Sequence, residues 1–238
     1  IVGEKITFFI NTRYQINRNH LNAVRRYNVD DYSDYTAETP AEWITNNTGD
    51  GKYVAMNGSE NKSLLGKISI NAFSGGKLSF LHSINRDRWD GYNHSYKYNP
   101  DGVSSSYRET DFTVIQLNHL ITNSLFYEAK LSNMENYNGN YLFVDKADSG
   151  YVNDVYANNY GPGFFTGGQD KGHSERWMTD QAIKLDLTWQ INSHHNIKTG
   201  ANYVHHDLVN EYYQIRNSYE GTPFESFFYE PIVYGDSS

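Results

Sequence analysis

The sequence contains no cysteine, which excludes disulfide bonds, thiolate metal sites and a cysteine nucleophile. Basic residues are scarce, because 20 Lys and Arg stand against 28 Asp and Glu, giving a formal net charge of −8. Arg25-Arg26 is the only adjacent basic pair, so composition argues against nucleic acid as a partner. The chain also lacks any run of apolar residues long enough for a transmembrane helix.

Hydrophobic residues make up only 38% of the chain, whereas aromatic residues reach 16% and include 21 tyrosines. A soluble core of this size normally contains more Leu, Ile and Val. Tyrosine combines an apolar ring with a polar tip and suits a surface with one wet side and one apolar side. The chain begins at Ile1 without a signal peptide, so we expect that the true beginning of the protein is missing.

Apolar and polar residues alternate in seven segments, which is the two-residue period of β-strands. The clearest segment is 181–191, where apolar residues from Ile183 to Ile191 occupy one face. Lys184, Asp186 and Thr188 occupy the other face. The predicted strands are residues 5–14, 63–70, 77–85, 111–121, 125–132, 181–191 and 195–206.

The connections between these strands alternate between short and long. The short ones carry turn-forming residues around Gly75, Asn123 and Ser193, and the long ones include residues 15–61 and 144–174. Transmembrane barrels show this asymmetry, with tight turns at one end and long loops at the other. The sequence therefore predicts an all-β fold: an antiparallel up-and-down transmembrane β-barrel segment of about seven strands with long extracellular loops.

We expect this sheet to be open. Seven antiparallel strands would leave the first and the last parallel, and closed bacterial single-chain barrels have even strand numbers. Residues 234–238 are predicted to end the chain inside a loop. No linker divides the sequence, so residues 1–238 are interpreted as one partial barrel domain whose remaining strands are absent.

Five stretches resemble TonB-dependent receptors, most closely the large type with an N-terminal carboxypeptidase-regulatory-like domain. They follow one another in order across nearly the whole chain. The stretches are GDGKYVAMN at 49–57, WDGYNHSYKYNPDG at 89–102, FYEAKLS at 126–132, FFTGGQD at 164–170 and TWQINSHHNIKTG at 188–200.

This resemblance implies a bacterial outer-membrane barrel of roughly 22 strands with a plugged lumen. It also implies import of a scarce nutrient, with outer-membrane lipid and the TonB complex as partners. The plug domain, the TonB box and the regulatory-like domain are all absent from these residues. The chain resembles only the early-to-middle part of the barrel, so the TonB complex would engage parts of the protein that are missing here.

No catalytic or cofactor motif is convincing, so the sequence favours a protein that is not an enzyme and carries no cofactor. The acidic run at 30–34 offers oxygen ligands for Ca²⁺, but it meets no ligand spacing and is better interpreted as a solvated loop tip. Neighbouring residues of a strand point to opposite faces, which argues against a metal site at His205-His206. No metal site is predicted.

The first long loop contains the best candidates for contact with a nutrient. Aromatic rings there can form platforms for sugars or hydrophobic nutrients, or they can simply pack the loops together. The candidates are Tyr27, Tyr32, Tyr35 and Trp43.

Two other functions stay open at this point. One is a soluble extracellular β-sandwich that binds carbohydrate, in which the apolar strand faces would cover each other. The other is a barrel that serves as a scaffold for other subunits of a larger envelope assembly.

Overall fold

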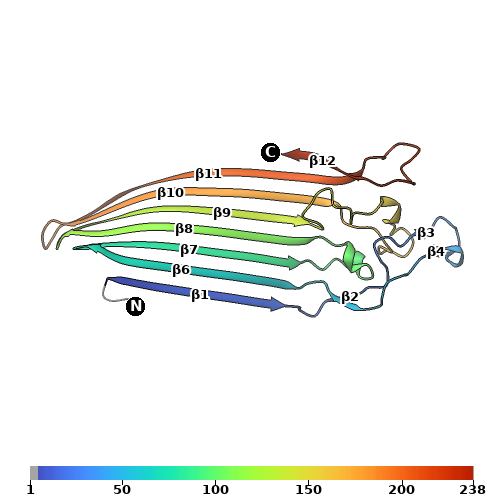
Figure 1. The fold of residues 1–238 in the computed structure, drawn as a ribbon, viewed down its shortest axis with the longest axis horizontal. Helices are drawn as coiled ribbons and strands as arrows, with labels where there is room; N and C mark the ends of the chain where they lie inside the picture. The colour runs from blue at the N-terminus through green and yellow to red at the C-terminus, as the bar shows by residue number, and fades with distance from the viewer. Residues whose placement is uncertain (1–4, 238) are drawn as a thin grey trace.

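A computed structural model describes residues 5–237 of the chain, which form one large antiparallel β-sheet with loops gathered at one end (Figure 1). Two small two-stranded sheets lie in the first long loop: β2 (Asn22–Val24) pairs with β5 (Tyr53–Ala55), and β3 (Ser33–Asp34) with β4 (Ile44–Thr45). The strands of the large sheet are β1 (Ile6–Asn17), β6 (Ser59–Phe73), β7 (Gly76–Asp90), β8 (Ser105–Thr122), β9 (Leu125–Tyr141), β10 (Gly172–Gln190), β11 (Asn196–Asn217) and β12 (Pro231–Ser237).

In the part of the chain that the structure describes, helical structure is limited to single turns: η1 (Pro40–Glu42), η2 (His94–Tyr96), η3 (Pro100–Gly102) and η4 (Asp154–Tyr156). No helix in the described range is long and apolar enough to cross a membrane.

The large sheet runs in sequence order from β1 through β6 to β12, which confirms the predicted antiparallel meander. It has eight strands rather than about seven. The missed strand, β12, lies where the sequence predicted a terminal loop, and its pairing runs from Asn217↔Pro231 to Glu211↔Ser237. It is short, begins at a proline and contains Gly235, so it lacks the alternation that revealed the other strands. Ser238 lies outside the described residues.

The short turns lie at one end of the sheet and the long loops at the other, as predicted (Figure 1). Gly75 in the β6–β7 turn has a φ of +73°, and a Cβ there would lie 2.5 Å from the carbonyl oxygen of Leu120. Only glycine fits that turn without strain. At the β10–β11 turn, the Asn192 side chain accepts hydrogen bonds from the backbone N–H groups of His194 and His195.

The strands continue well beyond their predicted loop-side ends. β10 and β11 pair from Gln190↔Asn196 to Gly172↔Gln214, whereas the sequence predicted strand only for 181–191 and 195–206. Backbone hydrogen bonds extend the ladder whatever the side chains are. In the added part, apolar residues such as Leu208 and Val209 are adjacent and lie on opposite faces, so hydropathy does not alternate there.

Register aligns apolar side chains into continuous rows across seven of the strands. Side chains that are directly opposite in an antiparallel pair share a face. We call the side that carries these rows the first face and the other side the second face. One row, the apolar row, consists of Phe8, Ile68, Phe80, Ile115, Leu131, Ile183 and Tyr203, each between 45% and 66% exposed. The next row towards the short turns consists of Ile6, Ile70, Leu78, Leu117, Ala129, Leu185 and Ala201.

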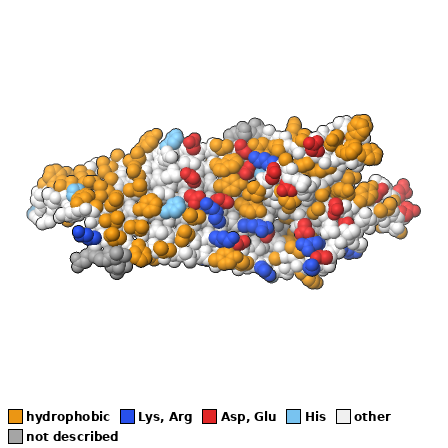
Figure 2. Space-filling model, viewed as in Figure 1, with side chains coloured by type: hydrophobic (Ala, Val, Ile, Leu, Met, Phe, Trp, Pro, Cys, Tyr) orange, Lys and Arg blue, Asp and Glu red, His pale blue; other side chains and the backbone are white. Residues whose placement is uncertain are grey.

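Figure 2 shows hydrophobic side chains gathered at the short-turn end of the sheet, with charged side chains nearer the loops. Between these two rows the second face is polar, although its next row towards the loops contains the apolar residues Phe9, Leu81, Val114, Ala182 and Val204. Lys184 and Asp186 form an ion pair there at 2.7 Å, and the Ser69 and Ser79 hydroxyls hydrogen-bond at 2.8 Å. Both serines are 6% exposed, as expected for the inner side of a curved sheet. The predicted separation of Ile183 and Leu185 from Lys184 and Asp186 is therefore confirmed.

The sheet is open: among residues 5–237, β1 pairs only with β6 and β12 only with β11. This confirms the expectation that the two outer strands do not pair with each other, but the argument from an odd strand number was wrong because the sheet has eight. Within the described range no second sheet covers the first face. The compact apolar core lies instead among the loops, where Ala23, Met56 and Tyr96 are buried.

Candidate ligand-binding surface at the loop end of the sheet

Four loops pack into one structure at the end of the sheet, which we call the loop cap: residues 18–58, 91–104, 142–171 and 218–230. Its buried core combines residues of the first two loops, and Phe165 of the third packs against Tyr96 with ring centroids 4.5 Å apart. The loops are further joined by hydrogen bonds from Val24 N to Lys97 O, Phe165 N to Ser95 O, Gly168 N to Val29 O and Asn153 Nδ2 to Glu225 O.

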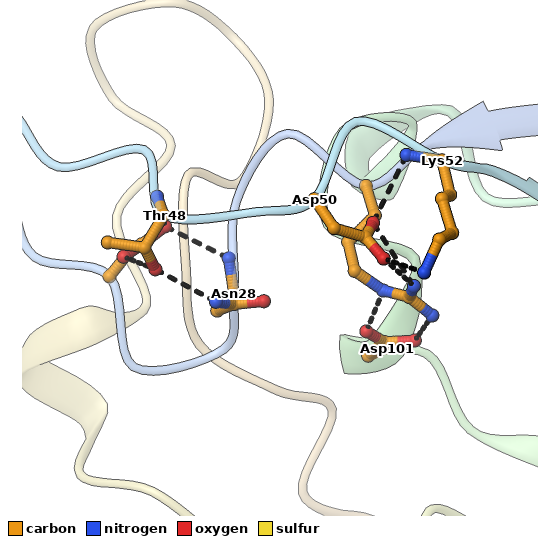
Figure 3. A network of polar contacts seen from close by, with 7 residues as sticks. Asn28, Thr48, Asp50, Lys52 and Asp101 are labelled. Carbon is orange, nitrogen blue, oxygen red and sulfur yellow. Dashed lines mark hydrogen bonds and ion pairs between the residues drawn. The ribbon is translucent and has the colours of Figure 1, made fainter.

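An ion-pair network fixes the first loop to the second (Figure 3). Arg25 contacts Asp101 at 2.5 Å through Nε and Asp50 at 3.2 Å through Nη1. The hydrogen bond to Asp101 is the main cause that raises the pKa of Arg25. Hydrogen bonds from Lys52 hold the pKa of Asp50 at about 2, so these groups keep opposite charges at neutral pH.

Asp31 organises the first loop from inside. Its carboxylate is 3% exposed and accepts hydrogen bonds from Asn28 N at 2.9 Å, Thr48 N at 2.8 Å and Thr48 Oγ1 at 2.7 Å (Figure 3). The interpretation of run 30–34 as a solvated tip is therefore wrong for Asp31, whose oxygens bind protein donors. In the part of the chain that the structure describes, no group of three or more His, Asp or Glu side chains is placed to hold a metal.

The structure brings together only two of the four aromatic residues predicted to contact a ligand. Tyr35 and Trp43 pack edge to face at 5.1 Å, and the Tyr35 hydroxyl donates to Thr166 Oγ1 at 3.0 Å. Tyr27 is buried within the loop cap, with 5% of its surface exposed, whereas Tyr32 is 39% exposed. The four rings therefore form no common platform, and ligand contact by Tyr32 stays a prediction.

A polar cleft of about 560 Å³ lies on the second face, in the loop-end half of β8 to β11. We call it the polar cleft. The centre of the cleft belongs to a row of residues that are paired across seven strands, and the residue from each strand is polar. That row consists of Gln15, Asn61, Asp87, Arg108, Asn138, Arg176 and Asn210.

Inside the cleft, few of the polar side chains form hydrogen bonds with each other. The Arg108 guanidinium lies 5.4 Å from the centre of the Trp89 ring, and its Nε donates to Asn138 Oδ1 at 3.4 Å. Asn140 Nδ2 donates to Ser106 Oγ at 2.9 Å. Amides and guanidinium groups so placed can bind a polar molecule in the cleft.

The carboxylates of Glu175 and Glu211, next to the cleft, form ion pairs on the first face of the sheet. Lys146, from the third loop, contacts Glu175 at 2.8 Å and Glu211 at 3.2 Å, and its Nζ lies 4.1 Å from the centre of the Tyr213 ring. Burial raises the pKa of Glu175, but hydrogen bonds from Lys146 and Tyr137 outweigh it and lower that pKa. Glu175 therefore stays ionised and bound to Lys146.

Two buried basic groups lie just beyond, where the third loop meets β10. His173 is fully buried, and its ring is stacked on Tyr141 at 4.7 Å. Burial lowers the pKa of His173. Lys171 is 4% exposed and pairs with Asp154 at 2.7 Å, and burial lowers its pKa as well.

Comparison of the chain with protein-family models, with curated proteins and with solved structures found no match. The resemblance to TonB-dependent receptors therefore stays a prediction from the sequence.

Proposed function

We propose that the chain is part of the wall of a bacterial outer-membrane β-barrel of the TonB-dependent receptor type, which binds and imports a scarce nutrient. The observation that carries the proposal is the apolar row, which is continuous across seven strands and solvent-exposed. Monomeric soluble proteins rarely expose contiguous apolar patches larger than a few hundred Å².

The dimensions of this surface fit lipid. Seven strands at a spacing of roughly 4.8 Å span about 30 Å. Along β10, the apolar side chains from Ile183 to Trp189 cover about 20 Å, close to the apolar band of roughly 25 Å on such barrels. On the second face, the side chains between the two apolar rows are polar, as in a barrel lumen, and Lys184 and Asp186 pair there. In this arrangement the loop cap lies outside the cell and the short turns lie in the periplasm.

The free edges of β1 and β12 belong to the same proposal. Unpaired backbone groups in hydrocarbon cost several kcal/mol each, so further strands must cover both edges in the assembled barrel. The TonB complex would act through parts of the protein beyond this chain.

Surface proteolysis tests the proposed topology. Protease added to intact cells is expected to cut within residues 18–58 and 142–171, and to spare the turns at Gly75, Asn123 and Ser193 until the outer membrane is opened. The protein is also expected to fractionate with the outer membrane and to need detergent for extraction.

Three outcomes would contradict the proposal. Extraction without detergent would favour a soluble carbohydrate-binding module. Cleavage confined to the short turns would invert the topology. Co-purification with stoichiometric envelope proteins, without any nutrient binding, would favour the scaffold function.

A further inference from the structure

The polar cleft contains two guanidinium groups that no carboxylate neutralises. Arg176 forms no hydrogen bond, ion pair or ring contact with any residue from 5 to 237, and Arg108 contacts only Trp89 and Asn138. Both arginines are in register with Asn138, from the strands on either side of β9. Their Cα atoms are therefore roughly 10 Å apart, and their side chains can hold one acidic group together or two separately.

The acidic residues around the cleft offset only part of this positive charge. Asp87 lies opposite Arg108 in register, but its Oδ1 accepts a hydrogen bond from Asn61 and it forms no ion pair with Arg108. Glu175 and Glu211 are bound to Lys146 on the first face. A local cationic site in a chain of net charge −8 therefore faces the proposed lumen. Free guanidinium groups bind carboxylate, sulfate and phosphate groups through paired hydrogen bonds.

The other residues that line the cleft indicate which class of acidic ligand it would bind. Amides of Asn138, Asn140 and Asn210 and hydroxyls of two serines line the cleft, with Trp89 and the 60% exposed Tyr212 at its sides. No aliphatic side chain lines it. Closely spaced amides and hydroxyls match the hydroxyl groups of a sugar, and aromatic rings pack against the apolar faces of sugar rings. A peptide ligand would instead need apolar pockets for its side chains.

We propose that the polar cleft binds a short acidic oligosaccharide, with Arg108 and Arg176 holding its carboxylate or sulfate groups. This inference rests on the proposed function, because it places the cleft on the lumen side of an importer. The cleft volume of about 560 Å³ lies within the usual range for small-molecule sites, which suits a short saccharide rather than a long polymer.

Binding by the detergent-purified protein tests the proposal, measured by isothermal titration calorimetry. The probes are tetragalacturonate for carboxylates, a sulfated tetrasaccharide for sulfates, maltotetraose as the neutral sugar and hexaglutamate as an acidic peptide. The variants are Arg108→Gln, Arg176→Gln and the pair combined. Lys198→Gln is the matched control, because Lys198 lies on the same face of β11 but near the short turns, in register with Thr188.

We expect one of the acidic sugars to bind more tightly than maltotetraose, and the difference between the two acidic probes identifies the acidic group. Each single arginine variant is expected to lose about 10-fold or more in affinity, while Lys198→Gln binds like the wild type. The double variant is expected to bind acidic and neutral sugars equally. Gel mobility before and after heating verifies that each variant is folded.

Preferential binding of maltotetraose or of hexaglutamate would overturn the proposal. So would the absence of binding to both acidic sugars, or unchanged affinity in the arginine variants. These results do not depend on membrane location, whereas the proteolysis experiment does, so failure of the ligand assignment and failure of the proposed function can be told apart.

Discussion

The effect of Ile183→Lys on the free energy of unfolding shows whether the first face of the sheet contacts lipid or water. Ile183 lies in the apolar row between Leu131 and Tyr203 and is 58% exposed in the open sheet. If that surface faces water, a change at an exposed position alters the free energy of unfolding by no more than about 0.5 kcal/mol. If it faces hydrocarbon, a lysine near the middle of the bilayer costs about 2–4 kcal/mol. A cost of about 2–4 kcal/mol corresponds to a shift of between roughly 30-fold and 1,000-fold in the folding equilibrium.

Val209→Lys is the matched control. Val209 lies on the same face, is 45% exposed and is in register with Trp177, six residues along β10 from Ile183 and nearer the loops. At that level the first face already carries charged residues, including Glu175 in the next row. A lysine there is expected to cost only about 0–1 kcal/mol, as near a membrane interface.

The assay is denaturant unfolding of the protein in lipid vesicles, followed by tryptophan fluorescence. The midpoint of Ile183→Lys is expected to fall well below that of Val209→Lys, with the slopes unchanged. Equal midpoints for the two variants, or an Ile183→Lys midpoint indistinguishable from the wild type, would refute the argument that the apolar row faces lipid.

Three further predictions concern the turns and the loop cap. Gly75→Ala is expected to destabilise the protein by more than about 1 kcal/mol in thermal unfolding, because the site combines positive φ with a close backbone carbonyl, whereas Gly221→Ala meets only the φ strain. Asp31→Ala is expected to cost about 1–3 kcal/mol by leaving buried donors unpaired and to speed proteolysis of loop 18–58. Asp34→Ala is the control and should not speed it, because the partly exposed Asp34 carboxylate accepts a local hydrogen bond from Thr36 N. Equal rates of proteolysis in the two variants would contradict the structural function of Asp31. Burial lowers the pKa of His173 in the folded protein, so as the pH falls the unfolded chain protonates this histidine before the folded protein does. The contribution of neutral His173 to the free energy of unfolding is therefore complete above about pH 6.5, the ordinary pKa of histidine. It is lost as the pH falls, by up to roughly 1.4 kcal/mol per pH unit. Thermal unfolding at pH 7.5 and 5.0 should show a smaller pH difference for His173→Gln than for the wild type, and an equal difference would contradict this.

The two faces of the strands could be predicted from the sequence because alternation alone decides them. Ile183 and Lys184 are neighbours in a strand and therefore lie on opposite sides, whatever the partner strand is. The full length of the strands could not be predicted in this way. β11 continues to Asn217 through residues whose hydropathy does not alternate, since Leu208 and Val209 are adjacent, and only its pairing with β10 and β12 reveals them as strand.

The candidate site depended on register, which the sequence did not specify. Arg108, Asn138 and Arg176 lie on three different strands and become neighbours only through the pairings of β9 with β8 and β10. The available signal was the polar, aromatic-rich sequence that follows the alternating segments at 85–93 and 132–137, but it does not indicate which side chains share a site. Proximity in sequence was also a poor guide in the first loop, where Tyr27 is buried and Tyr35 packs against Trp43.

In the proposed function, the first face of the sheet meets lipid and the second face meets water. Single cysteines at positions 183 and 184 test it directly, because these 238 residues contain no cysteine, and protein without an introduced cysteine measures background labelling. With nitroxide labels on the protein in outer-membrane vesicles, paramagnetic relaxation reports collisions with oxygen, which concentrates in lipid, and with a water-soluble nickel complex. We expect high oxygen access at Ile183→Cys and high nickel access at Lys184→Cys. Equal nickel access at both positions, or the reverse pattern, would contradict a lipid-facing first face.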